Sequence, residues 1–251
     1  MSCRFSFVLT QKILKAHNPP EEFVLAVVYA GLGYGKSAYH FKVSVECLMR
    51  TYGISETEAW ETLKTLIVFH PEQFFNKLDN ARSMGLNKIL LMDWDDAGYW
   101  LNAMDWDDPF VEALTKWLNV ARTDITGLLC STPTPTMIFR KLRNFPSAIT
   151  VRITKHTGDG HKWRRLATGY LQWVLPDLKK TRVRKLFIDE YSCRLPNEFF
   201  KWYKPLRDAY AKMALKAMKE RWEESKAAGK SKAILLEENP ELELPNLNLP
   251  R

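Results

Sequence analysis

FVLAVVYAGLGYGKS, residues 23–37, is the stretch of sequence that decides the fold. Its first seven residues form a continuous apolar run, which predicts a strand buried on both faces of a sheet. The next eight residues fit the relaxed phosphate-loop pattern, with Ala30 in the place where glycine is commoner, and are Ala30, Gly31, Leu32, Gly33, Tyr34, Gly35, Lys36 and Ser37.

This loop predicts that ATP and Mg²⁺ are bound. Backbone N–H groups wrap the phosphates, Lys36 reaches the β- and γ-phosphates, and Ser37 ligates the magnesium ion. The alternative is a glycine-rich turn in which Lys-Ser occurs by chance. The strand predicted before the loop and the helix predicted after it disfavour that alternative.

An acidic motif follows a second apolar run, Ile89 to Met92. ATP hydrolysis needs one carboxylate on the magnesium side and another that orients or deprotonates the attacking water. We assign Asp95 to magnesium and Asp96 to water activation, and keep Asp93 as the alternative magnesium-side acid because it directly follows the apolar run. An N-terminal helix cap with surplus surface carboxylates is the competing interpretation.

Two further groups of residues are candidates for catalysis. Ser131 and Thr132 end a third apolar strand, where a hydroxyl could sense the γ-phosphate, although they could equally begin a proline-containing loop. Arg140 and Arg143 follow on a predicted helix. Either could act as an arginine finger on the nucleotide of a neighbouring subunit, or could belong to a solvated helix face.

Alternating strand and helix patterns predict an α/β fold: a three-layer P-loop NTPase core with a central, mainly parallel sheet, plus a C-terminal β-hairpin and a long helix. Helices are expected after Lys36, after the capping-box sequence from Ser55, and after Pro71, whereas residues 65–69 could end a helix or form a short strand. The expected organisation is a core over 1–147, a basic strand segment continuing it over 148–195, a helix over 196–230 and an extended tail over 231–251.

The basic segment points to nucleic acid. Between residues 152 and 185 there are ten basic and two acidic residues, a balance of +8 that equals the net charge of the whole chain. Such clustering is typical of a phosphate-backbone binder. The predicted contacts are Arg152, Lys155, Lys162, Arg164 and Arg165. Trp163, Tyr170 and Trp173 could stack on bases, but Tyr170 and Trp173 are expected to face the core.

The remaining composition excludes several classes. The four cysteines are far apart and lack the spacing of a zinc site. No stretch reaches the roughly 18 apolar residues of a membrane span, and the N-terminus lacks the pattern of a secretory signal. We therefore expect a cytoplasmic protein without membrane partners.

The chain resembles the P-loop ATPases encoded by archaeal fuselloviruses and related plasmids, which are described as similar to DnaA or to helicase loaders. The resemblance rests on residues 30–37, on Trp94-Asp95-Asp96-Ala97-Gly98 and on the Ser131-Thr132 strand end. It implies an ATPase core of the additional-strand type, in which the sensor strand lies between the phosphate-loop strand and the acidic-motif strand. Asp96 stands where many such enzymes have glutamate.

The resemblance and the basic segment together imply an ATP-hydrolysing, DNA-associated motor or loader in viral or plasmid DNA replication, acting in the host cytoplasm. The expected partners are DNA, further copies of the chain in a ring or filament, and a replicative helicase or another replication or packaging protein. The alternatives are a DNA packaging or translocation ATPase and a nucleotide-gated DNA-binding assembly protein that hydrolyses little ATP. A nucleoside kinase is disfavoured by the basic hairpin.

Overall fold

The computed structural model describes residues 6–86, 88–105, 108–146, 148–156, 162–175 and 180–227. The predicted turn at 157–160, the tail over 231–251 and the side chain of Trp173 lie outside the described part of the chain. The chain divides into two compact units, Met1–Pro196 and Asn197–Arg251.

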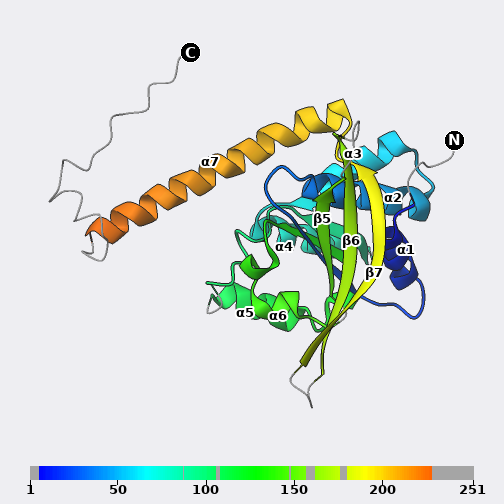
Figure 1. The fold of residues 1–251 in the computed structure, drawn as a ribbon, viewed down its shortest axis with the longest axis horizontal. Coiled ribbons are helices and arrows are strands. Elements are labelled where there is room, and N and C mark those ends of the chain that lie inside the picture. The colour runs from blue at the N-terminus through cyan, green and yellow to red at the C-terminus, as the bar shows by residue number, and fades with distance from the viewer. Residues whose placement is uncertain are drawn as a thin grey trace. The chain divides into compact units, whose positions relative to one another are not determined.

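A seven-stranded sheet with the order β2-β3-β4-β1-β5-β6-β7 forms the centre of the first unit (Figure 1). The strands β2, β3, β4, β1 and β5 pair in parallel, and β6 and β7 continue the sheet antiparallel to β5. Their bounds are β1 Val24–Tyr29, β2 Ile67–Val68, β3 Ile89–Trp94, β4 Ile125–Thr132, β5 Ile149–Lys155, β6 Arg164–Leu175 and β7 Lys180–Ser192. The α/β class and the parallel core are as predicted.

Helices cover both faces of the parallel strands, with α1, α2 and α3 on one face and α4, α5 and α6 on the other (Figure 1). Their bounds are α1 Val8–His17, α2 Lys36–Tyr52, α3 Glu56–Leu66, α4 Pro71–Ser83, α5 Pro109–Trp117 and α6 Arg140–Arg143, with short 3-10 turns η1 at Ala121–Thr123 and η2 at Pro135–Met137. Strand β1 serves both layers because successive side chains alternate. Leu25 and Val27 belong to the core on the α4–α6 side.

Local sequence signals determine the helix boundaries. Ser55 and Glu58 form the predicted capping box at the start of α3. The ambiguous residues 65–69 combine both expectations, because α3 ends at Leu66 and β2 occupies Ile67–Val68. Pro71 begins α4, as expected of a residue that lacks a backbone donor.

The antiparallel strands are covered by helices on one face. In β7, which the sequence did not predict, Phe187, Asp189 and Tyr191 are buried, whereas Ile188 and Glu190 between them are exposed. Asp189 faces α1 and α2, since its carboxylate accepts hydrogen bonds from the Val8 N–H and the Tyr39 hydroxyl. The prediction that Tyr170 is a core residue was wrong, because this side chain is half-buried on the outer face of the sheet.

The second unit contains α7, Asn197–Ala227, which matches the helix expected from Asn197. None of the helices in the described part of the chain combines the length and the apolar character needed to cross a bilayer.

Candidate nucleotide-binding site

The phosphate loop connects β1 to the amino end of α2. Gly33 and Gly35 have φ values of 75° and 87°, a left-handed backbone that favours glycine and lets the loop turn tightly before the helix. Lys36 begins α2, and its ammonium group donates to the Ala30 carbonyl at 3.2 Å, so the cation lies against the loop that would hold phosphates. A glycine-lined loop at a helix amino terminus fits an ATP phosphate chain.

Ser37 lies beside the acidic motif. Its hydroxyl donates to Asp95 Oδ1 at 2.8 Å, although 58 residues separate the two positions. Ser131, at the end of the neighbouring strand β4, donates to the same oxygen at 2.6 Å. The side chains of Ser37 and Asp95 together offer a hydroxyl and a carboxylate, the hard oxygen ligands that Mg²⁺ prefers.

This arrangement, with β4 between β1 and β3, is the strand order that the resemblance implied. The chain has the P-loop NTPase fold.

Asp96 has an unusual backbone. Its φ of 50° is positive, and it is the one non-glycine residue with this property among the residues that the structure describes. The Asp96 N–H donates to the Ser131 hydroxyl at 2.9 Å, which helps to hold the turn. Strained residues cluster at functional sites because the surroundings must over-determine them. The position therefore suits a carboxylate that acts on a substrate.

Asp93, the alternative magnesium-side acid, lies deeper in β3 and does not share the Ser37 contact. It is fully buried, and its Oδ1 is 2.6 Å from Nδ1 of His40. The structure thus brings Asp95 rather than Asp93 to the loop serine, and assigns Asp93 a partner that sequence reasoning missed.

His40 connects the two acids. Its Nδ1 bonds Asp93 and its Nε2 lies 3.4 Å from Asp95 Oδ1, with all three side chains buried. Burial opposes a charge on the ring, but the hydrogen bonds and negative charges of the two aspartates outweigh it and raise the pKa of His40 to about 9. The imidazole therefore carries a proton at neutral pH. Its spacing of three residues from Ser37, on one helix face, was the available signal.

The two candidates for sensing the γ-phosphate, Ser131 and Thr132, make different contacts. Ser131 connects Asp95 to the Asp96 backbone, as described above. Thr132 instead donates to the Thr134 carbonyl at 3.1 Å and packs closely against Gly98, where a Cβ atom would lie 2.5 Å from the threonine hydroxyl. Ser131 is therefore the hydroxyl that the structure brings into the acidic site.

The arginine-finger candidates lie far from the phosphate loop of their own chain. Arg140 and Arg143 are on α6, and the ring of Phe145 packs against Phe23, which precedes β1, at 5.8 Å. The phosphate loop follows the other end of β1, a six-residue strand of about 20 Å. The structure therefore does not bring these arginines to the phosphate loop of their own chain.

Side chains of β6 and β7 donate hydrogen bonds to backbone carbonyls of the phosphate loop. Arg165 Nε donates to the Tyr34 carbonyl at 3.2 Å, and the Tyr191 hydroxyl donates to the Gly35 carbonyl at 2.9 Å. A Cβ atom on Gly35 would lie 2.6 Å from Cys193 Cβ. The loop is thus fixed by residues more than 130 positions away in the sequence.

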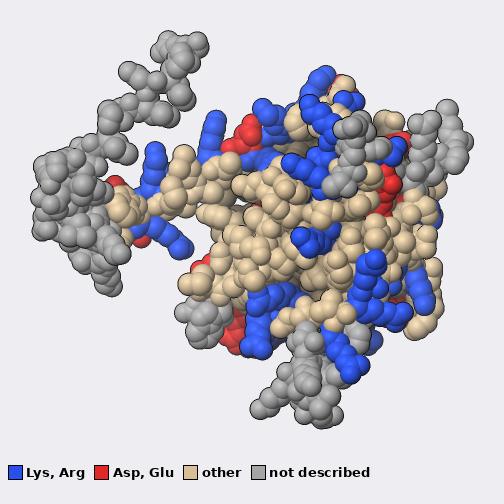
Figure 2. Space-filling model, in the orientation of Figure 1, with Lys and Arg blue, Asp and Glu red and all other residues tan. Residues whose placement is uncertain are grey.

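The prediction of a nucleic-acid contact at Arg165 was wrong, because this side chain is 7% exposed and holds the phosphate loop. The other four predicted contacts, Arg152, Lys155, Lys162 and Arg164, are exposed. Figure 2 shows lysine and arginine side chains at many places on the face in view, including the part of the molecule that β6 and β7 occupy in Figure 1. Four of the five predicted contacts are therefore at the surface.

Several known proteins are similar to this chain in sequence or in structure. The chain is 24% identical over 221 residues, 84% of each chain, to the uncharacterized protein B-251 of Sulfolobus spindle-shape virus 1. It is structurally similar to the genome packaging NTPase B204 of Sulfolobus turreted icosahedral virus 2, solved with ATP-gammaS, at 12% identity and a TM-score of 0.36, covering 65% of this chain and 97% of that one. It is also similar to the N-terminal domain of zonular occludens toxin from Neisseria meningitidis, at 13% identity and a TM-score of 0.38, covering 71% and 97%. No family model matches the sequence.

Proposed function

We propose that the chain is an ATPase that acts on DNA. The observation that carries the ATPase assignment is the 2.8 Å hydrogen bond between Ser37 and Asp95, which joins the phosphate loop to the acidic motif. Lys36 and the amino end of α2 bind the phosphates, Ser37 and Asp95 hold Mg²⁺, and Asp96 orients or deprotonates the attacking water. Bound Mg²⁺ supplies neutralisation of the phosphate charge.

Binding of DNA is supported by the exposed side chains of Arg152 and Lys155 on β5, Arg164 on β6 and Lys162 just before β6. In a ring or filament, Arg140 or Arg143 would act as an arginine finger on the nucleotide of a neighbouring subunit. The viral relative supports a role in the replication or packaging of a viral or plasmid genome in the host cytoplasm.

Between the two roles, we favour DNA packaging or translocation over helicase loading. Typical AAA+ loaders carry a small helical lid after the last core strand, whereas β6 and β7 follow β5 here and continue its sheet. Loading of a replicative helicase is the second candidate, since it uses the same ATP site.

The deciding experiment is ATP hydrolysis with and without single-stranded and duplex DNA. Lys36→Ala is expected to lower kcat/KM by at least about 100-fold, because it removes a charge that acts on the transferred phosphoryl group. The matched control Lys116→Ala removes an exposed lysine on α5 and is expected to be neutral. Failure of the wild type to bind ATP, or equal activity in Lys36→Ala, would contradict the proposal.

A second pair of variants separates a motor from a nucleotide-gated binding protein. Asp96→Asn is expected to abolish turnover while ATP binding remains, and Asp79→Asn, on the exposed face of α4, is its control. If the wild type hydrolyses little ATP and Asp96→Asn keeps ATP-dependent DNA binding, the binding-switch alternative is correct.

A further inference from the structure

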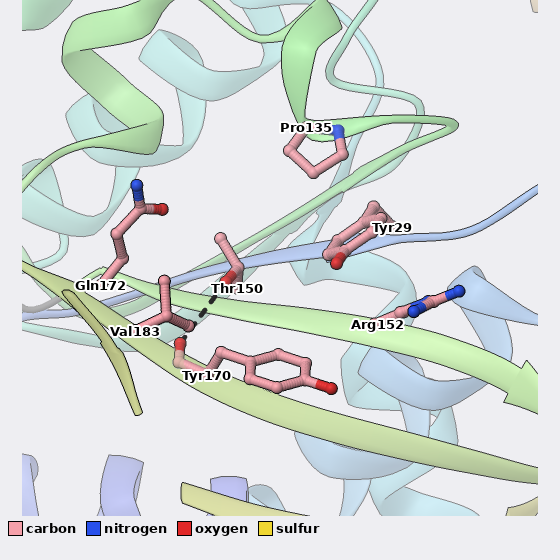
Figure 3. A pocket seen from close by; sticks show the side chains of 7 residues that line it. All are labelled: Tyr29, Pro135, Thr150, Arg152, Tyr170, Gln172 and Val183. Carbon is pink, nitrogen blue, oxygen red and sulfur yellow. Dashed lines mark hydrogen bonds between the residues drawn. The ribbon is translucent and has the colours of Figure 1, made fainter. Parts of the chain in front are cut away.

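A hollow of about 280 Å³ lies over β1, β5, β6 and β7, on the face of the sheet away from α1 and α2, and Pro135 of η2 also lines it. The side chains that line it include Tyr29, Thr150, Arg152, Tyr170, Gln172 and Val183. Figure 3 shows the rings of Tyr29 and Tyr170 on opposite sides of the hollow, with Arg152 at the same end as both rings. This volume is near the lower limit of ligand pockets and suits one small planar group.

Strand register explains why these side chains share a face. Thr150 pairs with Tyr170, and Tyr170 pairs with Lys185, so the three lie in one row across β5, β6 and β7. Arg152 lies two residues along β5 from Thr150, on the same face of the pleat. This face of the sheet therefore combines an aromatic ring with two exposed cations, Arg152 and Lys185.

The charge on this face favours a polyanion. Arg164, six residues before Tyr170 in β6, adds a third exposed cation and pairs with Glu190 at 3.2 Å. Among the described side chains of these strands, Glu190 is the one carboxylate on the outer face. Three cations against one acid fit a phosphate backbone better than a neutral protein surface.

The two tyrosines are close enough to influence each other. The pKa of Tyr29 is raised, first by burial, while the Arg152 charge lowers it and Tyr170 raises it. Tyr29 also ends β1, directly before Ala30 of the phosphate loop. A group bound between these rings would therefore lie next to the element that carries the nucleotide site.

We propose that this face binds single-stranded nucleic acid, with one base in the hollow against Tyr170 and Tyr29 and the flanking phosphates on Arg152, Lys185 and Arg164. Stacking on aromatic rings combined with backbone contacts to cations is how single strands are bound without sequence preference. A duplex keeps its bases in the stack and cannot insert one without paying for unpairing. The proposal relies on the proposed function only for the choice of DNA as the polymer.

The test is fluorescence anisotropy with a labelled oligothymidine strand and a labelled duplex of the same length, without nucleotide. Tyr170→Ala should weaken single-strand binding by about 5- to 150-fold, the loss of one stacked base, while Tyr170→Phe retains it. The matched control Tyr52→Ala removes a tyrosine that is 55% exposed on α2, and should bind as the wild type does. Equal affinity of Tyr170→Ala and Tyr52→Ala would overturn the proposal.

A salt titration tests the phosphate contacts. Arg152→Ala should reduce the slope of log affinity against log salt by about 0.7, the value for one phosphate contact on a single strand. Arg122→Ala, an exposed arginine in η1, carries the same charge change and should leave the slope unchanged. Equal slopes for the two variants, or tighter binding of duplex than of single strand by the wild type, would also overturn it.

Measurements of ATP hydrolysis and of oligomeric state distinguish a failure of this proposal from a failure of the ATPase assignment. DNA-free ATP hydrolysis should be unchanged in Tyr170→Ala; if the wild type hydrolyses ATP but binds no DNA, this proposal is wrong and the ATPase assignment stands. If DNA binding depends on Tyr170 but the wild type hydrolyses no ATP, this proposal stands and the ATPase assignment is wrong. If Tyr170→Ala changes the oligomeric state and not DNA affinity, the face is a subunit contact and the proposal fails.

Discussion

Replacement of His40 by glutamine tests whether the imidazole between Asp93 and Asp95 carries a proton in the folded protein. The pKa of His40 is about 9 in the fold, against an ordinary value of 6.5. Each pKa unit corresponds to about 1.4 kcal/mol, so the protonated ring contributes roughly 3 kcal/mol to stability.

The direction in which stability changes with pH follows from which state binds the proton. Between pH 6.5 and 9 the folded chain holds a proton on His40 that the unfolded chain has released. The contribution of His40 to the free energy of unfolding is therefore fully present below pH 6.5 and is lost as the pH rises through 9. Glutamine can still donate to a carboxylate but does not titrate, so His40→Gln should lack this dependence.

The assay is urea unfolding followed by tryptophan fluorescence at pH 6.0, 7.5 and 9.5, in EDTA so that no metal ion binds Asp95. The stability difference between the wild type and His40→Gln should shrink by about 3 kcal/mol across this range, and titrating groups that do not contact His40 cancel in the difference. In Asp93→Asn the ring loses its closer carboxylate partner, so the dependence should be smaller. A difference that stays constant with pH would show that the native ring is neutral and refute this reasoning.

Three further outcomes are expected. Gly35→Ala should destabilise the chain more than Gly33→Ala in urea unfolding, because both have positive φ but only a Cβ at Gly35 meets Cys193; partial recovery in Gly35→Ala/Cys193→Gly is the check, and equal losses would contradict it. Tyr191→Phe should cost about 1 kcal/mol and raise the KM for ATP, since it removes the hydrogen bond to the Gly35 carbonyl, and an unchanged KM would count against that role. Asp96→Ala should lose about 1 kcal/mol more stability than Asp96→Asn, because asparagine tolerates a left-handed backbone; matching unfolding midpoints would be inconsistent with the strain.

The parts of the site that could be predicted are those encoded locally. The apolar run, the glycine loop and the helix after it are adjacent in sequence, so their order alone specifies β1, the phosphate loop and α2. The Asp95 and Ser131 positions at strand ends were also readable, because parallel strands bring their carboxyl ends to one edge. The choice between Asp93 and Asp95 was not, since both follow an apolar run.

The parts that could not be predicted depend on distant partners. His40 stands among apolar residues of a helix, and its role requires an aspartate 53 positions away. Arg165 looked like one more cation in a basic run, and only the register of β6, which places it on the same face as buried Ala167, shows that it points inward. Strand β7 begins with alternating basic residues, so its pairing with β6 gave little hydrophobic signal.

The hydrogen bonds from β6 and β7 to the phosphate loop determine where the chain can be truncated. A fragment ending after β5 would retain the whole loop sequence but lose the groups that hold the Tyr34 and Gly35 carbonyls. The smallest fragment suitable for nucleotide-binding studies, or for transfer into a chimaera, therefore extends to Pro196. Deletions intended to remove only the antiparallel strands would also remove the groups that hold the phosphate loop.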